Sequence, residues 1–418
     1  MRIVPFFIAL LAAIVLIRAT PEDRIAKARA FYRSQPRYLQ PILGEPKVVN
    51  LPHVRADNCG TCHAEIYAEW KASTHARAWK DDAQFQEELK KHVGGDGKND
   101  ASWMCVNCHT PFEAQLERLV VGLEGGHLGK PQYVDNPNFD ARLQEEAITC
   151  ATCHVRDGVI VGPYGNTIAP HPVKKAEFLV TSEICLGCHQ ANAKLDQVEL
   201  ACVFDTGLEH AATEGAKTGE TCQSCHMPEI ERSVANVPVT PKRKSRRHFF
   251  GGSLIPKKEE FRKDVERMRP FYKDGMTAEW VDPPQAIAKG KETSIRFAVK
   301  NENSGHMLPT GDPERFIQID LEAKSADGKV LASHREVLGS KYEWNPVKKI
   351  SDTRLARGER REFEFKFTPE VSGKVVVSLR ASKWRIGQEN FDYHKLAGRY
   401  VAGVPFLDLV HEVSVTAP

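Results

Sequence analysis

Hydrophobic and polar residues alternate in five segments of the last third of the chain. These segments are Thr293 to Lys300, Phe316 to Ala323, Glu362 to Phe367, Val375 to Leu379 and Leu407 to Val415. Alternation with a period of two is typical of strands that bury one face. Turn-forming residues at 325–328 and 372–373 separate some of the runs. The pattern predicts an all-β sandwich with Ig-like topology over residues 275–418.

Residues 51–252 show a different pattern, with little strand periodicity and only short helical repeats. The clearest helical repeats lie at Glu65 to Trp79 and at Gln84 to His92. Large aliphatic residues are too few here to build a core for a region of this length, so something other than side chains must fill its interior. We expect a mainly α-helical and irregular domain, and therefore an α+β multidomain chain.

The N-terminus carries a short apolar segment. Ile3 to Ile17 holds no charged residue, and Arg2 and Arg18 flank it. This length suits a secretory signal and is shorter than the about 20 apolar residues of a membrane-spanning helix. Residues 1–19 are interpreted as a signal peptide or, because the cleavage site is poor, as an uncleaved N-terminal membrane anchor. Either alternative places the rest of the chain in the periplasm, outside the cell or at its surface.

Two segments connect these regions. Residues 20–50 contain scattered prolines and charged residues, and we expect a linker with one short helix, Asp23 to Ser34. Residues 253–274 are expected to form a linker helix around the charged stretch Lys257 to Met268.

The placement of the cysteines indicates the chemistry of residues 51–252. Eleven cysteines in 418 residues are too sparse for a disulfide scaffold. Ten of them fall in five copies of the motif Cys-x-x-Cys-His, and Cys202 is left over. The motif cysteines are Cys59 and Cys62, Cys105 and Cys108, Cys150 and Cys153, Cys185 and Cys188, and Cys222 and Cys225. The histidines that follow them are His63, His109, His154, His189 and His226.

The spacing within this motif fits the covalent attachment of haem. Two thiols three positions apart on a helical turn lie on one face, where they can add to the two vinyl groups of a porphyrin. The histidine that follows can then ligate the iron. The composition of the chain predicts about 0.01 such motifs by chance. Zinc sites and redox dithiols would not require a histidine after every second cysteine, so we predict five haem c groups.

Five porphyrins would also account for the missing aliphatic core, because they would form the interior themselves. We therefore expect the chain without haem not to fold in this region. The short spans between motifs would hold the haems close together, which favours electron hopping from one to the next.

Each iron needs a second axial ligand or keeps an open position. Six histidines are candidates for that distal ligand: His75, His171, His248, His53, His306 and His127. His75 lies on the predicted helix after the first motif, prolines flank His171, and His306 lies in a stiff, polar loop of the predicted sandwich. With histidines in surplus, low-potential bis-His haems are expected rather than His–Met haems.

Charge gives little direct information about partners. The formal net charge is +3, which does not point to a partner by itself. Residues 242–247 hold five positive charges. They either pair with haem propionates or dock an acidic redox partner, or they belong to a solvated linker. Nucleic-acid binding is not expected of a chain outside the cytoplasm.

Several stretches resemble the cytochrome c-554 family of multihaem cytochromes. They are Cys59 to Ala76, Trp103 to Pro111, Ile148 to Cys150, Ala169 to Cys185 and Cys225 to Pro228. The resemblance covers residues 53–250 and implies extracytoplasmic electron transfer through mostly bis-His haems stacked in pairs, sometimes with one five-coordinate haem. Residues 305–315 resemble a β-domain loop found C-terminal to haem domains in this group. The chain departs from the family's four-haem type member in its fifth motif and its added sandwich, so a specific partner is not carried over.

Three hypotheses for the function follow. The favoured one is an electron-transfer protein rather than an enzyme, with other redox proteins or multihaem cytochromes as partners. The second is a multihaem oxidoreductase that acts on a small nitrogen or sulfur compound at a five-coordinate haem. The third is a subunit of an extracellular haem filament. Sequence leaves open the redox partner, the oligomeric state and the pairing of distal histidines with haems.

Overall fold

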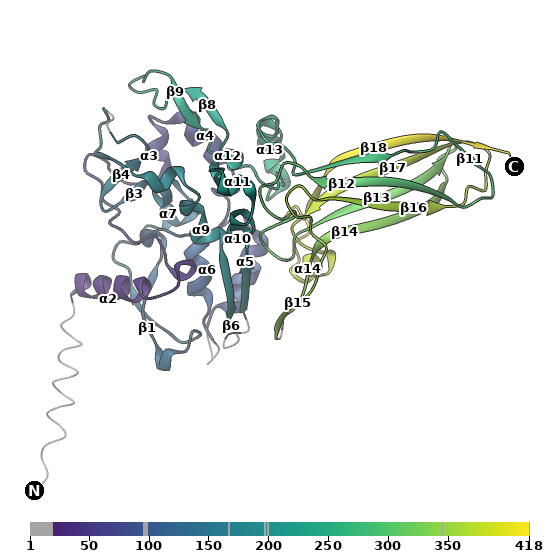
Figure 1. The fold of residues 1–418 in the computed structure, drawn as a ribbon. Coiled ribbons are helices and arrows are strands. Elements are labelled where there is room, and N and C mark those ends of the chain that lie inside the picture. Colours follow the sequence, from purple (N-terminus) through teal and green to yellow (C-terminus); the bar gives the residue numbers. More distant parts are fainter. Residues whose placement is uncertain are drawn as a thin grey trace, which may run out of the picture.

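The computed structural model describes residues 20–94, 99–165, 168–195, 198, 200–344 and 346–417. The expected signal peptide or anchor, residues 1–19, lies outside these residues. Figure 1 shows a helical and irregular first lobe and an elongated β lobe that ends at the C-terminus. The prediction of an α+β chain with an all-β C-terminal domain is confirmed. Within the described part of the chain, no helix is long and apolar enough to cross a membrane.

Short helices carry the five Cys-x-x-Cys-His motifs. The helices of the first lobe are α2 (Pro21–Arg33), α3 (Ala56–Gly60), α4 (Ala64–Ala72), α5 (Ala83–His92), α6 (Ser102–His109), α7 (Ala141–Glu145), α8 (Cys150–His154), α9 (Glu183–His189), α10 (Thr206–Ala211), α11 (Glu214–Lys217), α12 (Cys222–His226) and α13 (Arg262–Met268). One motif lies within each of α6, α8, α9 and α12, and the first motif begins in α3. The two thiols of each motif therefore start from one helical turn, as the attachment chemistry needs.

Strands in the first lobe form only small sheets. They are β1 (Arg118–Leu123), β2 (Pro131–Asp135), β3 (Val155–Arg156), β4 (Val159–Gly162), β5 (Val173–Lys175), β6 (Ala191–Leu195), β7 (Leu200–Phe204), β8 (Glu229–Arg232) and β9 (Arg243–Arg246). β1–β2, β6–β7 and β8–β9 are antiparallel pairs, and β4 lies between β3 and β5. Sheets this small do not bury a core of their own.

The helix α2 packs against β1, so the segment expected to be a linker is part of the first lobe. Ile25 and Tyr32 are buried on one face of α2 beside Trp103. The Tyr32 hydroxyl accepts a hydrogen bond from the Val120 amide at 3.2 Å. The buried apolar residues of α2 form a stripe along one side of the helix and attach it to the lobe. This stripe is hard to see in the sequence because charged residues lie between its members.

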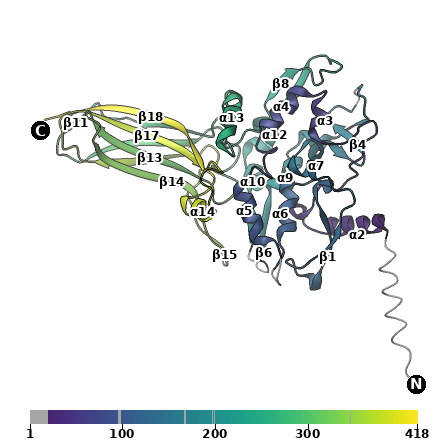
Figure 2. The same ribbon diagram turned by 180° about the vertical axis from the view of Figure 1, so that it is seen from behind.

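The β lobe is a sandwich of two sheets, seen from behind in Figure 2. Its elements are β10 (Met276–Val281), β11 (Ala286–Ala288), β12 (Thr293–Asn301), β13 (Phe316–Ser325), β14 (Val330–Trp344), β15 (Val347–Asp352), β16 (Arg360–Phe367), β17 (Gly373–Trp384), α14 (Gln388–Tyr393) and β18 (Gly403–Thr416). One sheet has the order β10-β12-β16 and the other β11-β18-β17-β13-β14-β15. Phe297, Ile319 and Leu321 from the two sheets meet in one buried core. This is the interior that the alternating sequence predicted.

Two expectations about single elements differ from the structure. The helix α4 stops at Ala72, because Ser73 is extended and its hydroxyl accepts a hydrogen bond from the Ala76 amide. His75 therefore lies beyond the helix rather than on it. The sequence also gives no signal for β15, because almost all of this strand is exposed on both faces.

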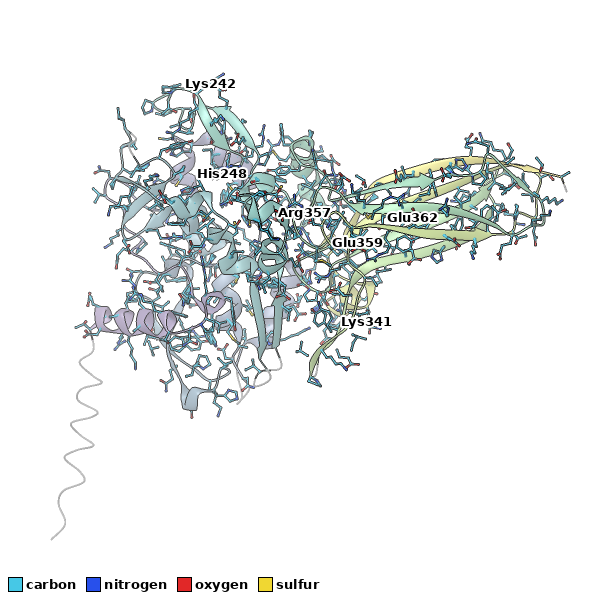
Figure 3. All side chains as sticks on the ribbon, viewed as in Figure 1. Lys242, His248, Lys341, Arg357, Glu359 and Glu362 are labelled. Carbon is cyan, nitrogen blue, oxygen red and sulfur yellow. The ribbon has the colours of Figure 1, made fainter. Side chains whose placement is uncertain are left out.

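Ion pairs hold the loops of the β lobe against the first lobe. Arg354 contacts Glu209 at 2.6 Å, and Arg357 contacts Glu220 at 2.6 Å. Figure 3 shows Arg357 at the junction of the two lobes. α13 and α14 also lie at this junction in both ribbon views. The lobes therefore share a polar interface, and loops of both can contribute to one site.

Candidate haem-binding site

A cavity of about 2830 Å³ runs through the first lobe. All ten motif cysteines and the five histidines that follow them line its wall. Protein interiors are normally close-packed, with few voids larger than a water molecule. A cavity of this size, walled by five attachment motifs, fits a set of bound haems.

Hydrogen bonds orient four of the motif histidines. In each one the Nδ1–H group donates to a backbone carbonyl: His63 to Val234 (2.5 Å), His109 to Ala78 (2.7 Å), His154 to Val161 (2.8 Å) and His226 to Gly251 (2.7 Å). An imidazole with its proton on Nδ1 presents the lone pair of Nε2 to a metal. The backbone of this chain therefore holds these rings in the form that ligates iron.

Three motif histidines face a second histidine across the cavity. Ring centres lie 6.3 Å apart for His189 and His75, 6.3 Å for His154 and His248, and 6.2 Å for His226 and His306. Two metal–nitrogen bonds of about 2 Å, with about 1 Å more from each nitrogen to its ring centre, span about 6 Å. Each pair is thus spaced to hold one iron between its rings.

His171 lines the cavity near His63. Burial lowers the pKa of His171, and the nearby His63 ring adds to this effect. The Nδ1 atom of His171 is buried and has no hydrogen-bond partner among the described residues. His63 and His171 are therefore candidates to share a fourth haem.

His109 has a different surrounding. Among the described residues, no histidine ring faces it at the spacing of the three pairs. Instead, the Phe85 ring stacks on it, with the ring centres 3.4 Å apart and the planes 5° from parallel. Burial lowers the pKa of His109, and the charge of Asp82, which is paired with Lys257, partly opposes this shift. The second motif is thus the one that lacks a candidate distal histidine.

Burial keeps four of the paired histidines neutral. It lowers the pKa of His75 and of His248 to about 3, and that of His189 and of His306 to about 4. Neighbouring histidines add to each shift through their charges. Since neutral imidazole is the form that binds a metal, these rings are ready to ligate iron at neutral pH.

Contacts between thiols order the motifs in space. Three pairs of thiols lie close enough to shift each other's pKa: Cys59 with Cys150, Cys188 with Cys108, and Cys185 with Cys222. Cys153 also lies near Cys188. The first motif therefore lies beside the third, the third beside the fourth, and the second and fifth both beside the fourth.

The loop that carries His306 belongs to the β lobe. The Asn301 side chain donates hydrogen bonds to the backbone carbonyls of His306 (2.9 Å) and Leu355 (3.1 Å). A Cβ atom at Gly305 would come within 2.9 Å of the Glu220 carboxylate, so the backbone approaches the first lobe closely here. The β lobe thus supplies one ring of a histidine pair whose other ring lies on α12 of the same chain.

Two of the six candidate distal histidines do not line the cavity. His53 lies 3.8 Å from the Asp57 carboxylate. The Nδ1 atom of His127 accepts a hydrogen bond from the Gly129 amide at 3.1 Å. The structure does not bring either ring to a motif histidine. The side chain of Cys202 lies outside the described part of the chain.

Glu69 on α4 is a site residue that sequence analysis does not single out. Its buried carboxylate contacts Arg232 at 3.1 Å and Arg247 at 2.8 Å, and it accepts a hydrogen bond from the His248 amide at 2.8 Å. This network positions His248 opposite His154. Arg247, the last residue of the basic run, therefore has an interior partner. No local pattern marks Glu69, because its partners are far away in the sequence.

Comparisons with known proteins match part of the sequence and the overall fold. Residues 58–155 match the family described as cytochrome c554 and c-prime. The fold is similar to the crystal structure of a penta-haem cytochrome c552 from Thermochromatium tepidum, with a TM-score of 0.62 and 18% identity over 86% of this chain and 99% of that one. A CARDB domain of the PF1109 protein from Pyrococcus furiosus matches 34% of this chain and 87% of its own, with 16% identity and a TM-score of 0.20. No curated protein matches the chain.

Proposed function

We propose that this multihaem c-type cytochrome binds five haems and transfers electrons through them outside the cytoplasm. The observation that carries the proposal is the spacing of three histidine pairs, 6.2–6.3 Å between ring centres, in a cavity that all five motifs line. The motif cysteines would hold the haems covalently. Haem iron, when bound, supplies a one-electron redox couple.

The chain's own residues would do the rest. The backbone carbonyls keep the motif rings in one tautomer, and burial keeps the opposing rings neutral. The proposed axial pairs are His63 with His171, His154 with His248, His189 with His75, and His226 with His306. The thiol contacts bring neighbouring motifs together, so electrons have short steps to make. Two imidazoles per iron favour low reduction potentials relative to His–Met ligation.

Protein purified from a host with working cytochrome maturation tests the proposal. We expect a mass increase equal to five haems, a Soret band, and low-spin bis-His signals from four haems in the EPR spectrum of the oxidised protein. The substitution His306→Ala should convert one of those four signals and leave three. His411→Ala, a histidine of the β lobe outside the cavity, is the matched control and should leave all four. Absence of a Soret band would refute the proposal.

A specific observation favours a second candidate function at the second motif. The described residues place no histidine ring opposite His109, whereas each of the other four motif histidines has a candidate partner. A haem at Cys105 and Cys108 would then be five-coordinate and could react with a small nitrogen or sulfur compound. A high-spin ferric signal that a small added ligand such as cyanide converts to low spin would support this candidate. Five low-spin signals would exclude it.

A further inference from the structure

Four exposed apolar side chains lie either just after β4 or in the loop between β8 and β9. Tyr164, Ile168, Val237 and Val239 are 52%, 106%, 60% and 74% exposed. The first three also line the wall of the cavity. Large apolar residues that are exposed in one cluster mark an interaction site more often than scattered ones do.

Hydrogen bonds place the loop between β8 and β9 directly against the first motif. The carbonyl of Val234 accepts from His63, and the Asn236 amide donates to the Cys62 carbonyl at 2.9 Å. The Asn236 side chain in turn accepts from the Ala64 amide at 3.3 Å. This loop therefore lies beside the first attachment motif.

The end of β4 and the hairpin β8–β9 form one continuous surface. The Tyr164 hydroxyl donates to the Lys244 carbonyl at 3.3 Å, and the Arg243 guanidinium lies 4.8 Å from the centre of the Tyr164 ring. We call this surface the hairpin mouth, and define it by Tyr164, Val237, Val239, Lys242, Arg243 and Lys244.

Unpaired basic groups rim the hairpin mouth. Lys242 and Lys244 are exposed, as is Lys174 on the adjacent β5. Within the described part of the chain, none of these three lysines makes an ion pair, although Glu231 lies across the hairpin from Lys244. Figure 3 shows Lys242 at the upper edge of the first lobe. An apolar centre with a basic rim is complementary to a partner with an acidic rim.

The order of the motifs makes the first motif one of three ends at which electrons can enter or leave. Among the described thiols, those of the first motif lie beside the third motif, and those of the second and fifth lie beside the fourth, whereas the fourth motif lies beside three others. A haem at the first motif would thus be a terminus. We propose that an acidic electron-transfer protein docks on the hairpin mouth and exchanges electrons with that haem. The exchange moves one electron, which oxidises one centre and reduces the other, and no bond forms or breaks. This inference rests on the proposed function.

The test uses the haem-loaded full chain and two electron donors. Reduced flavodoxin, a small acidic protein, is the docking probe, and the uncharged lumiflavin semiquinone is the donor that needs no docking. We expect the second-order rate with flavodoxin to fall between about 20 mM and about 300 mM salt, as screening predicts. The variant Lys242→Glu/Lys244→Glu should slow flavodoxin about tenfold at low salt and leave the lumiflavin rate unchanged.

A matched charge reversal on the β lobe serves as the control. Lys341 and Lys348 are also exposed, and Figure 3 shows Lys341 far from Lys242. Lys341→Glu/Lys348→Glu changes the net charge equally and should leave the flavodoxin rate within about twofold of the wild type. A third variant, Val239→Ser, should slow flavodoxin at high salt as well, because it alters the apolar centre.

Each other outcome overturns the inference. Equal slowing by the two charge reversals would show a net-charge effect rather than a docking site. Parallel slowing with both donors would show damage to the haem end of the chain. Unchanged flavodoxin rates together with lost binding to phosphatidylserine vesicles would assign the lysines to a lipid surface. Failure of lumiflavin to reduce the wild-type chain would instead refute electron transfer itself, and so separates this inference from the proposed function.

Discussion

The two lobes of this chain fill their interiors in opposite ways. In the β lobe, alternate residues of β13 are buried along its whole length, and side chains from both sheets close the core. In the first lobe, the buried side chains form several separate clusters, and a cavity of about 2830 Å³ is lined by all five motifs. The sequence of the β lobe therefore specifies its own interior, whereas the first lobe specifies the walls around a bound group.

Polar side chains stabilise the irregular segments that line the cavity, where no helix or strand pairs the backbone groups. Buried Gln115 donates to the carbonyls of Leu143 (2.8 Å) and Ala147 (2.6 Å), and buried Asn136 donates to two further carbonyls. Such contacts satisfy backbone groups of irregular segments that would otherwise be buried without partners. They define the shape of the cavity, but they bury too little apolar surface to replace the group inside it.

The largest effect should come from withholding haem. When the chain is made without cytochrome maturation, we expect residues 51–252 to remain unfolded and the sandwich at 275–417 to fold. The reason is that only the sandwich can offset chain entropy with its own apolar surface. Limited proteolysis with mass spectrometry should then yield a single resistant fragment from the β lobe. The matched sample is the haem-loaded chain, which should resist along both lobes.

The same digestion can contradict the comparison. If the first lobe resists protease equally with and without haem, its walls are stable alone and haem is not its core. If neither lobe survives without haem, the β lobe depends on the polar interface with the first lobe rather than on its own core.

The next largest effect should come from Glu69, whose carboxylate joins the walls to a proposed ligand. Glu69→Gln leaves Arg232 and Arg247 without their charged partner in a buried setting, which costs about 3 kcal/mol. We expect lower thermal stability of the first lobe and a changed EPR signal from the haem of the third motif, because glutamine leaves one acceptor oxygen for the His248 amide and both arginines, where Glu69 has two.

A control on the same helix shows whether the effect comes from the buried contacts of Glu69 or from the loss of any carboxylate on α4. Glu65 is exposed on α4, and Glu65→Gln should change neither the melting temperature nor the spectrum. An unchanged spectrum for Glu69→Gln would show that His248 is held in place without this carboxylate.

Two valines of the β lobe, one buried and one exposed, test how much a single buried side chain stabilises its core. Val377 on β17 is fully buried, and Val410 on the neighbouring β18 is 62% exposed. Val377→Ala should lower the free energy of unfolding of the β lobe by about 2 kcal/mol, and Val410→Ala by less than about 0.5 kcal/mol. Denaturant titration followed by far-ultraviolet circular dichroism measures both, and neither variant should alter the Soret band. Equal losses would mean that burial does not determine the stability of the sandwich.

The sequence predicts the strands of the β lobe and the attachment motifs of the first lobe, but it does not predict the contacts between distant residues. The strand at Phe316–Ser325 is visible because one face is buried, and β15 is not visible because both faces are largely exposed. Attachment motifs are local, so all five can be read directly. Distal ligands are not local: His75 lies more than a hundred residues before His189, and only the fold brings their rings together. Six candidates could be named from sequence, but not which rings would face each other.

The smallest predicted effect concerns the interface where the two lobes meet. Glu314 of the β lobe accepts a hydrogen bond from Gln84 of α5 at 3.0 Å. Burial, with a smaller effect of Asp312, raises the pKa of Glu314 to about 7. Between pH 4.5 and 7 the folded chain therefore keeps a proton that the unfolded chain releases, so stability falls as pH rises through this window. Glu314→Gln removes this dependence, and at pH 8 it should melt about 3 °C above the wild type, with no difference at pH 4. Glu412 lies on the exposed face of β18, so Glu412→Gln should not change how stability depends on pH. If Glu314→Gln melts no higher than the wild type at pH 8, the Glu314 carboxylate is solvated and the lobes meet less tightly than the contacts indicate.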